Sequence, residues 1–142
     1  MISKTYPSDV FDLHPILESD TIGVAQLDCC KVLLMNDSNY PWLILVPRVD
    51  GVTEIIELSE AQQQQFLSES AQVSRLLQSQ FSPDKLNVAA LGNVVSQLHI
   101  HHVARYKSDI AWPKPIWGAQ AVVAYPEDKA AALVDVLKKA LS

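Results

Sequence analysis

Three of the four histidines of the chain, His99, His101 and His102, lie within four positions. Their neighbours are apolar and β-branched residues, which are typical of a strand and not of a helix. Side chains alternate between the two faces of a strand, so Gln97, His99 and His101 are predicted to share one face. His102 is predicted to point to the opposite, partly core-facing side. Two imidazoles and a carboxamide on one face are costly to bury unless they are hydrogen-bonded or used for chemistry.

Three interpretations of this face stay open. The first is a pair of surface histidines without a function on an antiparallel strand. The second is a zinc site, but zinc needs a third and usually a fourth ligand. The remaining candidates are His14, far away in sequence, and the adjacent pair Cys29 and Cys30. The third is covalent catalysis, in which one imidazole attacks an electrophile and its neighbour donates a hydrogen bond or a proton. We expect no metal ion and no cofactor.

The segment from Gln97 to Val103 resembles the signature of the histidine triad (HIT) superfamily of nucleotide hydrolases and transferases. In that signature three histidines alternate with apolar residues. The second and third histidines are present as His99 and His101. Gln97 stands at the place of the first histidine, and His102 stands where an apolar residue is usual. The chain is therefore identified as a member of a branch of the superfamily with Gln in place of the first histidine.

Two further segments extend the resemblance over roughly residues 10 to 105. Gly92-Asn93 precedes the histidines, where the family has a Gly-Asn or Gly-Gln pair. Asn36-Asp37, a short loop and an apolar run that ends at Pro47-Arg48 resemble the family's acidic or amide residue, loop and strand. The histidine that usually follows this strand is absent, and Asp50 lies near its place.

The resemblance implies that His99 attacks the α-phosphate of a nucleotide and forms a covalent nucleotidyl-histidine, which water or another acceptor resolves. His101 would bind the nucleotide and donate to a phosphate oxygen or to the leaving group. A backbone carbonyl on the same strand would hold the His99 ring in one tautomer. The backbone of the first triad residue then matters more than its side chain, which is the catalytic role that we expect for Gln97.

The resemblance also implies three nucleotide-binding residues outside the histidine segment. Asn93 would bind a phosphate oxygen, and Asn36, or Asp37 if the register differs by one, would bind the ribose hydroxyls. Turn formation is an equally good explanation of Asn36 and Asp37. The predicted function is a nucleotidyl hydrolase or transferase that cleaves a nucleoside phosphoramidate or a dinucleoside polyphosphate. The alternatives are a weakly active or inactive nucleotide-binding HIT-like protein and a metal-binding β protein.

Length and composition limit the other properties of the protein. The 142 residues suit one domain, 1–142. A net charge of −5 argues against general binding to nucleic acid or to an acidic membrane. No apolar run approaches the length that crosses a bilayer, and the start of the chain does not resemble a signal peptide. With adjacent cysteines interpreted as free thiols, we expect a cytoplasmic protein. The resemblance implies a homodimer whose partner molecule is a small nucleotide.

The expected fold is α+β, a HIT-like antiparallel sheet of about five or more strands with one long helix packed on it and a C-terminal helix. In the core, about 10–105, strands are predicted at 21–27, 31–35, 42–46, 85–91 and 94–105, and Ser59 is predicted to cap a helix from Glu60 to about Gln80. The C-terminal extension, 106–142, is expected to contain a Trp/Pro loop at 112–118, a strand at 119–125 and a helix after Pro126.

The Trp/Pro loop has alternative explanations. The tryptophans of the loop, Trp112 and Trp117, are expected to cover the core or a dimer contact, or else one of the two indoles lines a nucleotide pocket by stacking. Arg105 is expected to be a surface charge.

Overall fold

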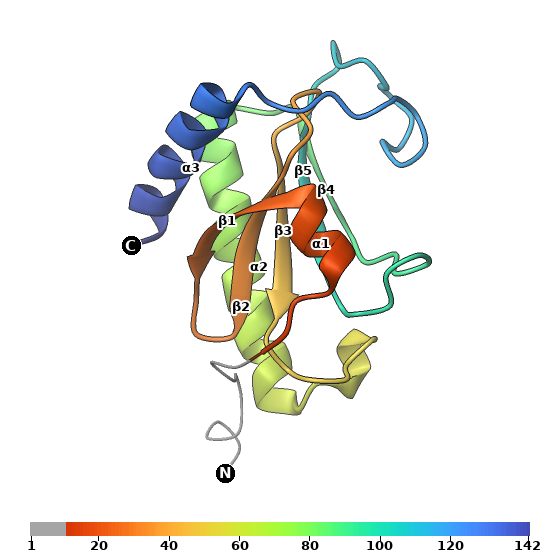
Figure 1. Ribbon diagram of the computed structural model, residues 1–142, viewed down its shortest axis with the longest axis vertical. Coiled ribbons are helices and arrows are strands. Elements are labelled where there is room, and N and C mark those ends of the chain that lie inside the picture. The colour runs from red at the N-terminus through yellow and green to blue at the C-terminus, as the bar shows by residue number, and fades with distance from the viewer. Residues whose placement is uncertain (1–10) are drawn as a thin grey trace.

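A computed structural model describes residues 11–142 and contains one five-stranded antiparallel sheet (Figure 1). The strand order is β1-β2-β3-β5-β4, and every neighbouring pair is antiparallel. The strands are β1 (Thr21–Gln26), β2 (Cys30–Met35), β3 (Trp42–Pro47), β4 (Lys85–Ala89) and β5 (Ile100–Arg105). The helices are α1 (Pro15–Asp20), α2 (Glu60–Phe81) and α3 (Glu127–Leu141), with a short 3-10 helix at Ile55–Glu57. The α+β prediction is confirmed.

The central strand β3 is buried along its whole length, which explains its continuous apolar sequence. It pairs with β2 on one side and with β5 on the other. In the second pairing Ile44 lies opposite His101, and Trp42 lies opposite Val103. This register places the histidine strand next to the middle of the sheet.

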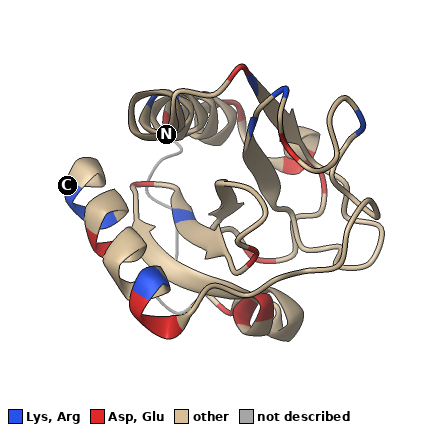
Figure 2. Cartoon of the chain, turned by 90° about the horizontal axis from the view of Figure 1, so that it is seen from above, with Lys and Arg blue, Asp and Glu red and all other residues tan. Residues whose placement is uncertain are grey.

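The two longer helices, α2 and α3, cover one side of the sheet, which we call the helical face. It carries the even-numbered residues of β5 and of β2, together with Leu43 and Leu45 of β3, and α2 packs against β3 and β5. The N-terminus of α2 is fixed by the predicted capping box, in which Ser59 and Gln62 exchange hydrogen bonds between side chain and backbone. In α3, acidic residues begin the helix and Lys138 and Lys139 end it, which complements the helix dipole (Figure 2).

The other side of the sheet, which we call the pocket face, is covered by the short helix α1 and by irregular chain. A second apolar cluster forms there between Trp42, Ile44 and Val103 of the strands, Phe11 and Leu17 near the N-terminus, and residues of the loop after β5. Because short segments cover this face instead of a long helix, space remains beside the strands.

Arg105 anchors the loop after β5 and is not a surface charge, as only 1% of it is exposed. Its Nε donates to Asp109 at 2.7 Å, Nη1 donates to Asn87 and Nη2 donates to the carbonyl of Lys114. Its guanidinium also lies over the ring of Trp112, at 5.6 Å from the centroid. The expectation of a surface charge is wrong, because this arginine binds one strand to three separate segments.

Two predicted strands differ from the structure. The histidine strand begins at Ile100 and not at residue 94, so His99 immediately precedes it. Residues 119–125 form no strand. The N–H groups of Val123 and Tyr125 donate to side chains, Asp37 Oδ1 and Asn36 Oδ1, so no backbone ladder forms along this segment. Among residues 11–142, no helix is both long and apolar enough to span a membrane.

Candidate active site

Two imidazoles meet on the pocket face where β5 begins. His101 is the second residue of β5, and His99 lies two positions earlier, so both rings point to the same side. The ring centroids are 5.0 Å apart and the rings meet edge to face. Only 7% of each residue is exposed. The shared face predicted for His99 and His101 is confirmed.

The His99 ring is held by the backbone of Gln97. Its Nδ1 lies 2.7 Å from the Gln97 carbonyl oxygen. A carbonyl accepts hydrogen bonds and cannot donate them, so the proton of the neutral ring sits on Nδ1. Nε2 then carries the lone pair. This is the arrangement expected from the sequence, in which the backbone of the first triad position orients the second residue.

The side chain of Gln97 has a separate structural contact. Its Oε1 accepts from the N–H of His14 at 2.8 Å, and its Nε2 donates to the carbonyl of Asp12 at 2.9 Å. The carboxamide therefore binds the N-terminal segment against the start of β5. His14 itself caps α1, since its Nδ1 accepts from the N–H of Ile16.

The His101 ring is enclosed by two indoles. Trp42 Nε1 donates to His101 Nδ1 at 3.0 Å, and the Trp117 ring lies on another side, 5.3 Å away between centroids. Burial lowers the pKa of His101 to about 3, and the nearby His99 and His102 lower it further in the same direction. His101 is thus a neutral imidazole at physiological pH.

An apolar pocket of about 310 Å³ opens beside the two imidazoles. Its walls come from α1, from the end of β2, from the middle of β3 and from the loop before the histidines. The lining residues are Ile16, Leu17, Asp20, Met35, Ile44, Leu91, Gly92, Asn93, Val94, Val95, His99, His101 and Trp117. A cavity with mainly apolar walls and a few polar groups suits a small organic ligand.

Asn93 lines this pocket, on a turn that Gly92 makes possible with a φ of 74°, and its contact with a phosphate oxygen stays a prediction. Asn36 and Asp37 do not line it. Asn36 Oδ1 accepts from the N–H of Tyr125 at 3.0 Å, and Asp37, which is 3% exposed, binds the backbone of its own turn and of the C-terminal extension. The structure therefore shows the turn-forming role, and the contact with ribose stays a prediction.

Two residues of the site were missed by sequence reasoning. Asp20, the last residue of α1, is one of the residues that line the pocket. Trp42 binds His101, but in the sequence it is one apolar residue of a buried strand. Of the two tryptophans in the loop, Trp117 lines the pocket, as one of the two explanations predicts, whereas Trp112 stacks on the Arg105 guanidinium.

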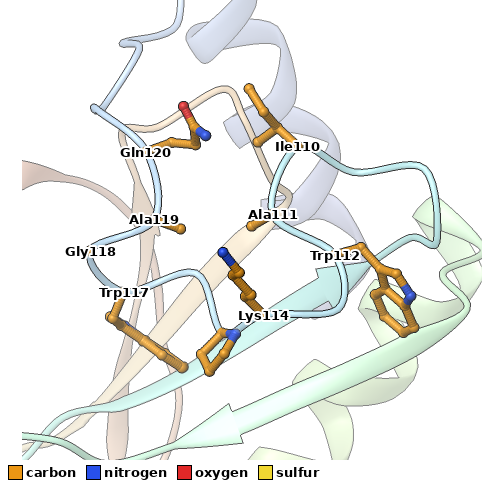
Figure 3. A pocket seen from close by; sticks show the side chains of 9 residues that line it. Ile110, Ala111, Trp112, Lys114, Trp117, Gly118, Ala119 and Gln120 are labelled. Atoms are coloured by element: carbon orange, nitrogen blue, oxygen red, sulfur yellow. The ribbon is translucent and has the colours of Figure 1, made fainter.

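The loop after β5 encloses a second cavity of about 510 Å³, lined by residues between Ile110 and Gln120 (Figure 3). The Lys114 side chain lies between the two arms of this loop (Figure 3). Trp117 lines both cavities, so the two are neighbours. Neither His99 nor His101 lines the larger one.

His102 points to the helical face, as predicted. It is fully buried, its Nδ1 lies 3.1 Å from the carbonyl of Ile100, and its Nε2 lies 2.7 Å from Ser70 Oγ of α2. Burial lowers its pKa to about 4, although the bond to Ile100 acts in the opposite direction. Both ring nitrogens are occupied inside the protein, so this imidazole is not available to a ligand.

Within residues 11–142, one cluster brings together three side chains that can bind a metal ion, and this cluster contains no histidine. Cys29, Cys30 and Glu69 place their ligand atoms within 4.8 Å of one another. The Glu69 carboxylate already accepts from the N–H groups of Cys29 and Cys30, each at 2.8 Å, and from Gln65. This buried carboxylate attaches α2 to the start of β2.

Comparisons with known proteins agree with this architecture. The chain is similar to a histidine triad protein from Marinobacter aquaeolei VT8, with 50% identity, a TM-score of 0.90 and coverage of 92% of this chain and 96% of that one. It is also similar to one from Bradyrhizobium japonicum, with 44% identity, a TM-score of 0.90 and coverage of 93% and 98%. A third, from Sinorhizobium meliloti 1021, has 36% identity, a TM-score of 0.89 and coverage of 92% and 96%.

A more distant structure shares only the fold. It is described as a hypothetical histidine triad nucleotide-binding protein from Sulfolobus tokodaii, with 13% identity, a TM-score of 0.65 and coverage of 87% of this chain and 85% of that one. A search among curated proteins finds no match. The model of the HIT domain matches residues 17–108, a range that contains all five strands and both imidazoles of the site. The chain therefore belongs to the HIT domain family.

Proposed function

We propose that the protein is a nucleotidyl hydrolase or transferase that acts through a covalent nucleotidyl group on His99. The observation that carries this proposal is the 2.7 Å contact between His99 Nδ1 and the Gln97 carbonyl. It leaves the Nε2 lone pair available on a ring that lines an apolar pocket. A neutral imidazole in a fixed tautomer is a competent nucleophile.

The proposed reaction has two displacements at the α-phosphorus. His99 Nε2 attacks it, the bond to the leaving group breaks, and the leaving group takes the electron pair. The Nδ1 proton stays between His99 and the Gln97 carbonyl, which stabilises the positive charge that forms on the ring. Water or another acceptor then attacks the phosphorus, and His99 leaves with its lone pair restored. A proton from the water is released with the nucleotide.

The pocket supports binding of a nucleoside next to these atoms. Ile16, Leu17, Met35 and Ile44 form apolar walls that suit the faces of a base. Asn93 lines the same pocket, and we propose that it contacts a phosphate oxygen. That the protein works as a cytoplasmic homodimer stays a prediction, and sedimentation of the purified protein tests the dimer.

Mass spectrometry of the intact protein after rapid mixing with diadenosine tetraphosphate tests the proposal. We expect a transient mass increase of one adenylyl group on the wild type and none on His99→Ala. His102→Ala is the matched control, because it removes an imidazole from the same strand but from the other face, and it is expected to keep the adduct. If the wild type binds the nucleotide without an adduct or any release of AMP, the protein is a nucleotide-binding protein and the proposal is wrong.

A further inference from the structure

The two imidazoles of the site are held by partners of opposite kind. His99 Nδ1 faces a carbonyl oxygen, which only accepts, whereas His101 Nδ1 faces the indole N–H of Trp42, which only donates. His99 therefore carries its proton on Nδ1, and His101 carries its proton on Nε2. Two neighbouring rings of the same type are fixed in opposite tautomers.

The Trp42 contact also opposes protonation of His101. A second proton would sit on Nδ1 and would point directly at the indole N–H, 3.0 Å away between the nitrogens. Trp42 cannot rotate away easily, because it is 6% exposed and packs with Tyr40, Ile44 and Val103. The charged form of His101 would in addition be buried beside the His99 ring.

We propose that Trp42 is a positioning residue that keeps His101 a neutral hydrogen-bond donor, and that the enzyme therefore acts on nucleotides whose leaving group departs as a stable anion. This inference rests on the proposed function. Phosphate, polyphosphate and carboxylate leaving groups belong to this class. Nucleotides linked to an alkylamine do not, because their nitrogen needs a proton before the P–N bond breaks.

The His101 tautomer limits the leaving group because it determines whether a proton can be transferred to it. When His99 attacks, the leaving oxygen of an anhydride takes the electron pair of the P–O bond and is stable as an anion. His101 Nε2–H stabilises it by a hydrogen bond and keeps its proton. An alkylamine would need the whole proton, and a neutral imidazole that gives it away becomes an imidazolate, which is a far stronger base.

Heteronuclear NMR of protein with nitrogen-labelled histidines tests the tautomers without any substrate. In the wild type, we expect a proton on Nδ1 of His99 and on Nε2 of His101. In Trp42→Phe, His101 is expected to populate both tautomers, while His99 is unchanged. Trp117→Phe is the matched control, because it removes an indole that packs on the same ring but donates no hydrogen bond to it. A wild-type His101 with its proton on Nδ1 would overturn the inference, whether or not the variants fold.

Leaving-group selectivity gives the second test. We expect the wild-type kcat/KM for an adenosine phosphoramidate of an alkylamine to be at least about 100-fold below that for the mixed anhydride of AMP with a carboxylic acid. Trp42→Phe is expected to reduce this ratio about tenfold, and Trp117→Phe to leave it within about twofold. Equal rates on both substrates in the wild type would refute the selectivity. An absent adduct on His99 refutes the proposed function instead, so the two failures are distinguishable.

Discussion

His99 and His102 lie three positions apart and share one local hydrogen bond. In each ring Nδ1 faces the carbonyl of the residue two positions earlier, at 2.7 Å from Gln97 for His99 and at 3.1 Å from Ile100 for His102. They differ at the other nitrogen. His102 Nε2 meets Ser70 Oγ inside the helical face, whereas His99 lines the pocket. The same backbone geometry thus prepares both imidazoles, and the face of the sheet decides which one a ligand can reach.

A lowered pKa does not separate the two faces. Burial lowers the pKa of His101 to about 3 and that of His102 to about 4. One of these rings belongs to the site and the other packs against a helix. A perturbed histidine becomes a candidate for function only when a cavity gives access to it.

The largest effect that we expect outside the site tests His102 as a structural residue. Its pKa is about 4 in the folded protein against 6.5 for an ordinary histidine, so the unfolded chain binds more protons between these values. Its contribution to stability is complete above pH 6.5 and is lost as the pH falls toward 4, by about 3 kcal/mol. The measurement is urea unfolding of the wild type and of His102→Gln at pH 7 and at pH 4.5. The free energy of unfolding should fall less between these two pH values in the variant than in the wild type.

The activity of His102→Gln tests whether the helical face and the pocket face are independent. At pH 7 we expect its nucleotide hydrolysis to stay within about threefold of the wild type, because His102 does not reach the pocket. A loss comparable to that of His99→Ala would mean that the two faces are not independent.

The sequence predicts that His99 and His102 point to opposite faces, because side chains alternate between the two faces along one strand. The capping box of α2 and the buried strand β3 are predicted for similar reasons, since their signals lie within a few residues. The bond from Trp42 to His101 depends instead on the register between β3 and β5, which no local pattern encodes. Glu69 is missed in the same way, because in the sequence it is one polar residue of a helix.

Residues 119–125 show the opposite error, in which a local pattern predicts too much. Their apolar composition suits a strand, but no sheet edge receives them. Asn36 and Asp37 supply acceptors for the N–H groups of Tyr125 and Val123, so these N–H groups are satisfied without a partner strand. The turn residues therefore determine the conformation of a distant segment, which a pattern search cannot detect.

A smaller effect is expected from Asp109, which fixes the loop on the pocket face. Burial raises the pKa of its carboxyl, but hydrogen bonds from Arg105 and from three backbone N–H groups outweigh burial and lower the pKa to about 2. The stabilisation is present above the ordinary pKa of 3.8 and is lost as the pH falls toward 2. We expect Asp109→Asn to lower the free energy of unfolding at pH 7 by about 2 kcal/mol.

The chain offers a matched control for this carboxylate. Asp135 of α3 also pairs with a cation four residues away, Lys139, but its side chain is 61% exposed. Asp135→Asn should change the unfolding free energy by less than about 0.5 kcal/mol. Urea titrations of both variants check the difference. Equal effects would show that burial on the pocket face does not strengthen the Arg105 pair.

The smallest effect is expected from removing the Ser70 hydroxyl, which is hydrogen-bonded to His102. Because His102 Nδ1 faces a carbonyl, its Nε2 is an acceptor and Ser70 Oγ donates to it at 2.7 Å. Ser70→Ala removes this donor and leaves a buried nitrogen unpaired, so we expect a loss of about 1 kcal/mol at pH 7 with unchanged nucleotide hydrolysis. Ser68→Ala is the control, since Ser68 is exposed on the same helix and alanine is the better helix former. If Ser70→Ala instead also raises the activation free energy of hydrolysis by about 1 kcal/mol, the helical face also acts on the site. The effect would then pass through His102, which lies next to His101 on β5.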